Sequence, residues 1–142
     1  MNTLRKTERL CSRKQIERLF KDGYGFVCYP YSVRWLFDRS EPTLKTEMPT
    51  KQGVKILISV SKRRFRRAVD RNRVKRITRE CYRLRKENLI ENLPDTSNHP
   101  ILLSLSYIDT KMPDFQYISH RFETLMERLQ KEVSYVQVGK VD

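Results

Sequence analysis

The sequence has few of the side chains that bind metal ions or form disulfides. It contains three cysteines, Cys11, Cys28 and Cys81, and two histidines, His99 and His120. The cysteines are odd in number and widely spaced, and no pair has the CxxC or CxxxC spacing of a zinc site. We therefore expect reduced cysteines, incidental histidines and no metal ion bound by the protein alone.

Long apolar runs are also missing. None approaches the roughly 20 residues that a membrane-spanning helix needs, and the first residues, MNTLRKTERLCSRK, lack the apolar core of a signal peptide. We expect a cytoplasmic protein without membrane contact. The 142 residues, 38 % of them hydrophobic, suffice for a modest core. We expect 1–142 to form a single domain with flexible termini.

Acidic residues are scarce and scattered: the chain has 17 of them against 30 lysines and arginines, and its net charge is +13. Protein nucleases gather two or three carboxylates around magnesium or use a histidine acid–base pair. Asp70 and Glu80 instead stand far apart among arginines, and the two histidines form no recognisable pair. The sequence thus disfavours a protein-only nuclease. Glu80 is expected to pair with Arg76.

The positive charge is concentrated in the segment 62–86, which holds 13 of the 30 basic residues and only two acidic ones. Helical spacing over this segment predicts two faces. The expected core face consists of Val74, Ile77, Cys81 and Leu84. The expected basic face consists of Arg71, Asn72, Lys75, Arg76, Arg79 and Arg83.

Like charges four residues apart on this basic face cost an isolated helix about 0.2–0.5 kcal/mol per pair. A folded domain that keeps such pairs is best explained by a polyanionic partner. A merely solvated charged face is the weaker interpretation, because it would repel itself without compensation.

Further elements flank the basic segment. Ser12 and Gln15 form the pattern of a capping box, and a helix from there would carry an apolar stripe and end at Gly23. Alternation predicts a strand from Phe26 to Phe37, with a possible extra strand near its start. The remaining expected elements are a loop at 40–53, strands Val54–Val60 and Ile101–Ile108, a loop at 93–100, and a last helix with Asp114 as its N-cap.

The expected order is therefore α-β-β-(β)-α-β-α, an α+β fold in which helices pack on a small mixed sheet. The last helix carries an apolar stripe at helical spacing. That stripe consists of Ile118, Phe122, Leu125, Met126, Leu129 and Val133.

The run from Lys62 to Glu80, with Arg71-Asn72-Arg73-Val74-Lys75-Arg76 at its centre, resembles the signature of the bacterial ribonuclease P protein component. Residues 4–10, Phe20, Gly23 and the segment 58–62 also match that family at the expected offsets. The resemblance covers most of 4–122, and its central motif is long enough to be specific.

This resemblance implies a function. Proteins of the family are the small subunit of a ribonucleoprotein endonuclease that removes the 5′ leader from precursor tRNA. The large subunit is the ribonuclease P RNA, which carries the catalytic centre and uses Mg²⁺ held mainly by the RNA and the substrate. The family fold contains a left-handed crossover around the basic helix, an exception to the usual handedness. No obligate protein partner is expected.

Residue by residue, the resemblance implies two binding regions. The expected RNA-binding residues are Lys62, Arg66, Arg67, Arg71, Asn72, Arg73, Lys75, Arg76 and Arg79. The expected cleft for the substrate leader, between the first helix and the sheet, contains Phe20, Tyr31, Arg34 and Trp35. Ile16 stands where many members have phenylalanine, so one aromatic surface of that cleft is missing.

Two alternatives stay open at this point. The chain could be a general nucleic-acid-binding protein, although it has no helix-turn-helix, KH-type GxxG loop or aromatic RNP signature. Phe20 could be an ordinary core residue, as aromatics at regular spacing usually are.

Overall fold

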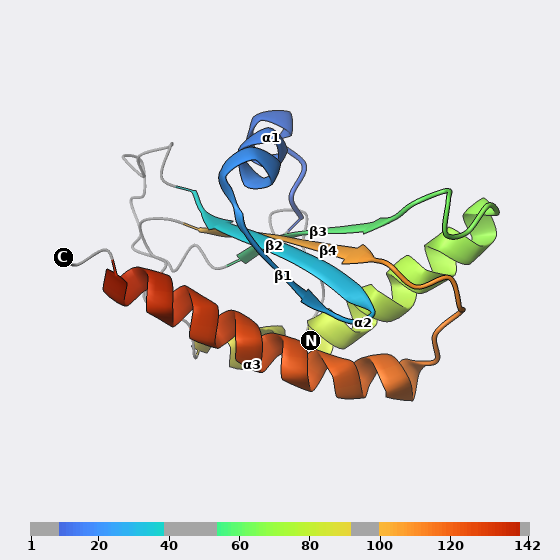
Figure 1. The fold of residues 1–142 in the computed structure, drawn as a ribbon. Helices are drawn as coiled ribbons and strands as arrows, with labels where there is room; N and C mark the ends of the chain where they lie inside the picture. Colours follow the sequence, from blue (N-terminus) through green and yellow to red (C-terminus); the bar gives the residue numbers. More distant parts are fainter. Residues whose placement is uncertain (1–8, 39–53, 92–99, 140–142) are drawn as a thin grey trace.

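The computed structural model describes residues 9–38, 54–91 and 100–139 (Figure 1). The loop expected at 40–53, most of the loop expected at 93–100 and His99 lie outside these residues. The described elements follow the order α-β-β-β-α-β-α. They are α1 (Arg13–Asp22), β1 (Tyr24–Cys28), β2 (Tyr31–Phe37), β3 (Val54–Val60), α2 (Ala68–Glu91), β4 (Ile101–Tyr107) and α3 (Phe115–Gly139).

The four strands form one mixed sheet in the order β1-β2-β4-β3. β1 pairs with β2 and β2 with β4 in antiparallel fashion, whereas β3 and β4 are parallel. The parallel neighbours β3 and β4 are joined through α2 in a crossover connection. The predicted α+β class is confirmed, and the extra strand near Phe26 is β1.

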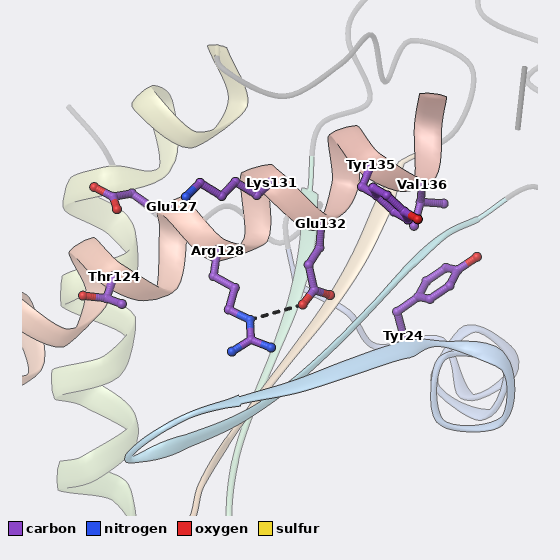
Figure 2. A pocket seen from close by; sticks show the side chains of 8 residues that line it. All are labelled: Tyr24, Thr124, Glu127, Arg128, Lys131, Glu132, Tyr135 and Val136. Atoms are coloured by element: carbon purple, nitrogen blue, oxygen red, sulfur yellow. Dashed lines mark hydrogen bonds and ion pairs between the residues drawn. The ribbon is translucent and has the colours of Figure 1, made fainter. Parts of the chain in front are cut away.

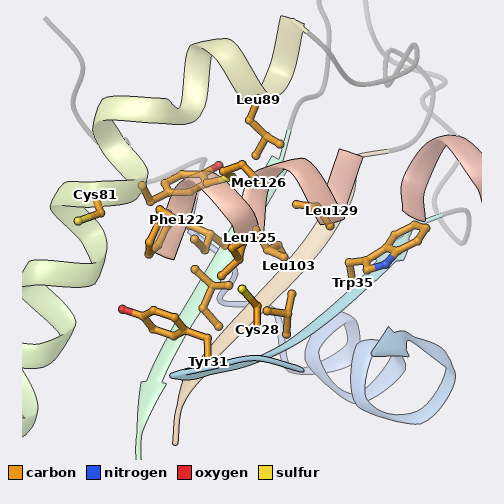
Figure 3. Packing of buried hydrophobic residues seen from close by; sticks show 14 of the residues in the cluster. Cys28, Tyr31, Trp35, Cys81, Leu89, Leu103, Phe122, Leu125, Met126 and Leu129 are labelled. Carbon is orange, nitrogen blue, oxygen red and sulfur yellow. The ribbon is translucent and has the colours of Figure 1, made fainter. Parts of the chain in front are cut away.

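The helices divide unequally between the two faces of the sheet (Figure 1). α2 and α3 cover one face, and the main core lies between them and the sheet. Figure 3 shows this core, in which Tyr31 and Trp35 of β2 and Leu103 of β4 meet the apolar stripe of α3. The six residues predicted for that stripe are all buried, and burial of each large aliphatic side chain contributes about 1.5–3 kcal/mol.

α1 covers part of the opposite face. A smaller cluster forms there from Leu10, Leu19 and Leu102, and Ile16 packs against it half-buried. Gly23 ends α1 as predicted: its N–H donates to the carbonyl of Leu19 over 2.9 Å. A Cβ at this position would collide with that same carbonyl oxygen, so the short turn from α1 into β1 favours glycine.

The capping box predicted at the start of α1 forms only by half. The Ser12 hydroxyl accepts the backbone N–H of Gln15 over 3.4 Å. The Gln15 side chain does not return to the cap but donates to the buried carboxylate of Asp38 over 2.6 Å. Arg18 bonds the other oxygen of Asp38 at 3.1 Å, so these polar contacts fasten α1 to the end of β2.

The predicted core face of α2 needs correction. Val74 and Cys81 are fully buried and Ile77 partly, but Leu84 is 49 % exposed. Thr78 and Tyr82 are buried in its place. The buried face is rotated because α2 packs against α3 as well as against the sheet. The Tyr31 hydroxyl donates to the Thr78 hydroxyl at 2.6 Å, and Thr78 in turn donates to the Val74 carbonyl.

The basic segment begins outside the helix, since 61–67 form a turn before α2 starts.

Candidate nucleic-acid interface

The turn at 61–67 presents several basic side chains and is fastened by one aromatic ring. The Ser61 carbonyl accepts the N–H groups of Arg64 and Phe65, each over 3.2 Å. Phe65 is buried, and its ring lies 6.0 Å from that of Tyr107 at the end of β4. The basic side chains on either side of Phe65 are exposed. The turn is therefore anchored to the core while its charges face solvent.

Arg71 has a structural contact that the sequence did not reveal. Its Nη1 donates to the carbonyl oxygens of Phe65 and Arg66, both at 2.9 Å. The side chain predicted to contact RNA thus also ties the turn to the first part of α2. Its guanidinium has further N–H groups and could still donate to a phosphate.

The remaining predicted cations are unpaired and lie together in sequence from the turn through the first half of α2. Within the described residues, none of them has an ion pair, and all are exposed or partly exposed. We call this set the basic surface: Lys62, Arg66, Arg67, Arg73, Lys75, Arg76 and Arg79. Asn72 is exposed among them.

The second half of α2 differs, because its arginines have partners. Arg83 pairs with Glu80 at 2.6 Å, and the hydrogen bond from Arg83 lowers the pKa of the Glu80 carboxyl. Arg85 donates to Ser119 of α3 over 2.6 Å. The predicted pairing of Glu80 with Arg76 is therefore wrong, and this leaves Arg76 unneutralised. Along α2, the arginines that have no ion pair among the described residues thus lie in the first half of the helix, where the resemblance expects RNA contacts.

On the α1 side, a strip of the sheet stays partly exposed beyond α1. We call it the open sheet face: Val27, Ser32, Arg34, Ser59 and Ser106. The hydroxyls of Ser59 and Ser106 bond each other at 2.9 Å. The neighbouring Ser104 is buried, and its hydroxyl has no hydrogen-bond partner among the described residues. Hydroxyls and a guanidinium can bond ribose and phosphate oxygens without reading sequence.

Phe20 borders the open sheet face and is not a core residue, since it is 44 % exposed. The Arg34 guanidinium carbon lies 5.8 Å from the centre of the Phe20 ring. Arg34 also donates to the Phe20 carbonyl over 3.3 Å. An exposed ring beside a fixed cation is suited to stacking on a nucleobase.

Tyr31 and Trp35, predicted for the same cleft, lie on the other face of the sheet. Both are fully buried, and Trp35 Nε1 donates to Glu132 of α3 over 3.2 Å. This part of the prediction is wrong, because residues one apart on a strand point to opposite faces. The structure brings together Phe20 and Arg34, and it assigns Tyr31 and Trp35 to the core beneath α2 and α3.

The basic surface and the α1 side of the sheet meet at the β3 edge. Arg79 of α2 lines a small cavity of about 190 Å³ together with Arg9 and the middle of β3. Arg9 is exposed and forms a bridge to Ile56. Positive charge therefore continues from α2 around this edge, so one bound RNA assembly could contact both regions.

A larger, mainly apolar groove of about 660 Å³ lies elsewhere, between β1 and the second half of α3 (Figure 2). The rings of Tyr24 and Trp35 stack there with centroids 4.9 Å apart. Arg128 and Glu132, one turn apart on α3, form an ion pair along its wall at 3.3 Å. With Glu127 and Lys131 also present, acidic and basic side chains balance, so the groove offers no net attraction to a polyanion.

Neither a metal cluster nor a membrane span is found among the described residues. No three His, Cys, Asp or Glu side chains converge there, so these donors do not fit a protein-held magnesium site. No described helix is long and apolar enough to cross a bilayer.

Sequence reasoning missed the serines of the open sheet face. The alternation along β3 and β4 could have revealed them, because Ser59 and Ser106 point to the face of the sheet opposite to that of the neighbouring buried aliphatic residues. The clamp made by Arg71 had no sequence signal, since it depends on how the turn at 61–67 folds back.

Comparison with known proteins agrees with the fold and the motif. Residues 4–130 match the model of the family "Ribonuclease P". The chain is 34 % identical over 126 residues to the ribonuclease P protein component of Porphyromonas gingivalis, covering 89 % of this chain and 85 % of the relative. It is 30 % identical over 135 residues to that of Chlorobium phaeobacteroides, covering 91 % and 89 %.

Solved structures show the same fold at lower identity. The ribonuclease P protein of Staphylococcus aureus superposes with a TM-score of 0.62 at 19 % identity, over 87 % of this chain and 95 % of that one. The protein of Thermotoga maritima gives a TM-score of 0.61 at 20 % identity, over 85 % and 96 %. Because the family model spans most of the chain and its relatives match over nearly their whole length, this chain belongs to the ribonuclease P protein component family.

Proposed function

We propose that this chain is the protein subunit of a ribonuclease P holoenzyme and that its basic surface binds the catalytic RNA. The observation that carries the proposal is the set of unpaired cations between Lys62 and Arg79. Each can neutralise a phosphate and release a counterion, which makes binding strong and salt-dependent. Family membership supports ribonuclease P RNA as the anion.

The second part of the proposal concerns the substrate. Phe20, Arg34 and the open sheet face bind the unpaired 5′ leader of precursor tRNA. Phe20 stacks on a leader base, while Arg34 and the serine hydroxyls of Ser59 and Ser106 bond its backbone. These contacts tolerate any leader sequence because each base has a stacking face. Mature tRNA, which lacks the leader, would not gain from them.

The third part concerns the chemistry. Mg²⁺ would supply the chemistry of a hydrolysis that leaves a 5′-phosphate on the mature tRNA, by lowering the pKa of water and by stabilising the charge of the leaving oxygen. The metal would be held mainly by the RNA and the substrate, since the described residues provide no cluster of ligands. The role of this chain is to hold the RNA and the leader in place, in the cytoplasm, where the sequence predicts it to act.

Reconstitution tests the proposal. The purified chain, folded with ribonuclease P RNA and Mg²⁺, should cleave a precursor tRNA at the junction of leader and acceptor stem. The chain alone should not cleave, and digestion of the complex with ribonuclease A, followed by inhibition of that nuclease before the substrate is added, should abolish the specific cleavage. Specific cleavage by the chain alone, or failure to bind the RNA, would contradict the proposal.

A further inference from the structure

A group of exposed aromatic side chains at one end of the molecule has no part in the proposed function. Tyr29, in the turn between β1 and β2, is 48 % exposed, and Tyr117, in the first turn of α3, is 42 % exposed. Met112 is also exposed beside them. These three side chains line a pocket of about 420 Å³, which we call the tyrosine pocket.

The walls of the tyrosine pocket are fixed by hydrogen bonds. Tyr107 lies in its lining, and its hydroxyl donates to the Lys111 carbonyl over 2.8 Å. Asp109 accepts the backbone N–H groups of Thr110 at 2.6 Å and of Lys111 at 3.2 Å. Arg121 of α3 donates to the Tyr29 carbonyl over 2.7 Å. The exposed rings therefore stand on an ordered frame.

The two carboxylates that line the pocket accept hydrogen bonds from neighbouring backbone N–H groups. Asp114 accepts the backbone N–H of Tyr117 over 2.8 Å and so caps α3. Desolvation raises the pKa of Asp109, but the backbone N–H groups of Lys111 and Thr110 and the Tyr29 hydroxyl together lower it below its usual value. Both carboxylates are thus committed to N–H and O–H donors, while the Lys111 side chain faces solvent.

The pocket is continuous with the basic turn. Phe65 of that turn packs on Tyr107 with ring centroids 6.0 Å apart. Desolvation and the nearby Asp109 carboxylate raise the pKa of the Tyr29 phenol, whereas the charge of Arg64, the exposed neighbour of Phe65, acts in the opposite direction. The turn therefore joins Arg66 of the basic surface to the side of the molecule that carries the two exposed tyrosine rings.

From this placement we propose that the tyrosine pocket binds an unpaired nucleobase of the ribonuclease P RNA, stacked on Tyr117 with Tyr29 beside it, and with the adjoining phosphate against Arg64. The inference rests on the proposed function and adds a base-stacking site to its phosphate contacts. The pocket is large enough for a base, and stacking on tyrosine is favourable for any base. Continuity with the basic turn favours RNA as the occupant, because the basic side chains of Arg64, Lys111 and Arg121 outnumber the carboxylates of Asp109 and Asp114 around the pocket.

The catalytic RNA, and not the substrate leader, is the partner in this proposal. Tyr107 belongs to the core on the α2 and α3 side of the sheet. Phe20 and Arg34 lie on the opposite face. A leader bound beside Phe20 would have to pass around the sheet to reach Tyr117, whereas RNA on the basic turn is already adjacent.

The test compares two exposed tyrosines of α3. Tyr117→Ala should weaken binding of the full chain to ribonuclease P RNA by about tenfold. Tyr135→Ala, which removes an 81 % exposed ring at the far end of the same helix, should change it less than about twofold. Tyr117→Phe should retain binding, because the ring remains. Equal affinities for Tyr117→Ala and Tyr135→Ala would overturn the proposal.

A second measurement does not depend on a variant. RNA substituted with 4-thiouridine and irradiated in the wild-type complex should crosslink to the peptide that contains Tyr117 or to the one that contains Tyr29. Crosslinks confined to other peptides would overturn the proposal. So would a Tyr117→Ala complex that binds the RNA normally but loses affinity for precursor tRNA, because the leader would then be the occupant.

Arg76→Ala separates this inference from the proposed function on which it rests. If the basic surface binds RNA and the pocket does not, Arg76→Ala weakens RNA binding while Tyr117→Ala leaves it unchanged, and only the pocket proposal fails. If neither variant affects binding and the wild-type chain does not bind the RNA, the proposed function fails as well.

Discussion

The two faces of the sheet are built from alternating residues of the same strands, yet they differ in every physical respect. On the α2 and α3 side, Tyr31 and Trp35 are fully buried and hydrogen-bonded to helices. On the α1 side, Arg34 stays partly exposed beside Phe20. The comparison teaches that neighbouring aromatic and basic residues on β2 differ by face: the aromatic ones are buried under α2 and α3, and the basic one stays partly exposed beside α1.

The largest expected effect distinguishes the faces by stability. Trp35→Ala removes a fully buried indole and should lower the free energy of unfolding by about 3–5 kcal/mol. Arg34→Ala, one residue away on the other face, should lower it by less than about 1 kcal/mol. Denaturant unfolding followed by circular dichroism measures both. Similar losses for the two variants would show that the faces are not divided as described.

The next effect sharpens the comparison within α2, between unpaired and paired cations. Binding of ribonuclease P RNA through about six phosphate contacts should give a log–log salt slope of about −4 to −5. Arg76→Ala should make the slope shallower by about 1 and leave stability unchanged. Arg83→Ala, which removes an arginine paired with Glu80, should change the slope less. A wild-type slope shallower than about −2 would contradict the role of the basic surface.

A smaller effect tests the contact between the sheet and α2. Tyr31→Phe keeps the buried ring but removes the hydroxyl that donates to Thr78. Thr78 retains its bond to the Val74 carbonyl, so the loss should be about 0.5–1.5 kcal/mol of unfolding free energy. RNA affinity, measured by filter binding, should not change. A large loss of RNA affinity in Tyr31→Phe would indicate that Tyr31 takes part in RNA binding after all.

The smallest effect uses the cysteines as reporters of the two faces. Cys28 and Cys81 are buried on the helix-covered side, whereas Cys11 is exposed. Desolvation raises the pKa of Cys81 to about 11, so its thiol stays protonated at neutral pH and reacts slowly. A disulfide reagent should therefore label one thiol quickly in the folded protein and three after denaturation. Rapid labelling of Cys81 at neutral pH would mean that α2 does not cover this face as described.

Much of this architecture could be predicted from the sequence because periodicity reports burial directly. The stripe on α3, the cap at Asp114 and the strands β3 and β4 followed from spacing alone, and the structure confirms them. The family motif identified the fold and the basic segment. The exposure of Phe20 agrees with its expected place at a binding region, although contact with RNA stays a prediction.

Two of the failures, at Leu84 and Gln15, have their physical origin in contacts between distant elements. Leu84 was assigned to the core of α2, but α3 rotates the buried face toward Thr78 and Tyr82. Trp35 was assigned to the cleft, although the period-2 pattern had already placed it on the opposite face from Arg34. The Gln15 side chain does not complete the capping box, because it donates instead to the buried Asp38 carboxylate. A local sequence pattern does not show which of several possible partners a side chain contacts in the folded protein.

The affinity of precursor tRNA relative to mature tRNA in the Phe20→Ala holoenzyme tests the division between the faces most directly. If Phe20 stacks on the leader, the variant should bind precursor tRNA about tenfold more weakly and mature tRNA as before, with an unchanged melting temperature. Trp35→Ala, as far as it folds, should affect both RNAs alike. Equal losses of affinity for precursor and mature tRNA in Phe20→Ala would contradict the assignment of the open sheet face to the leader.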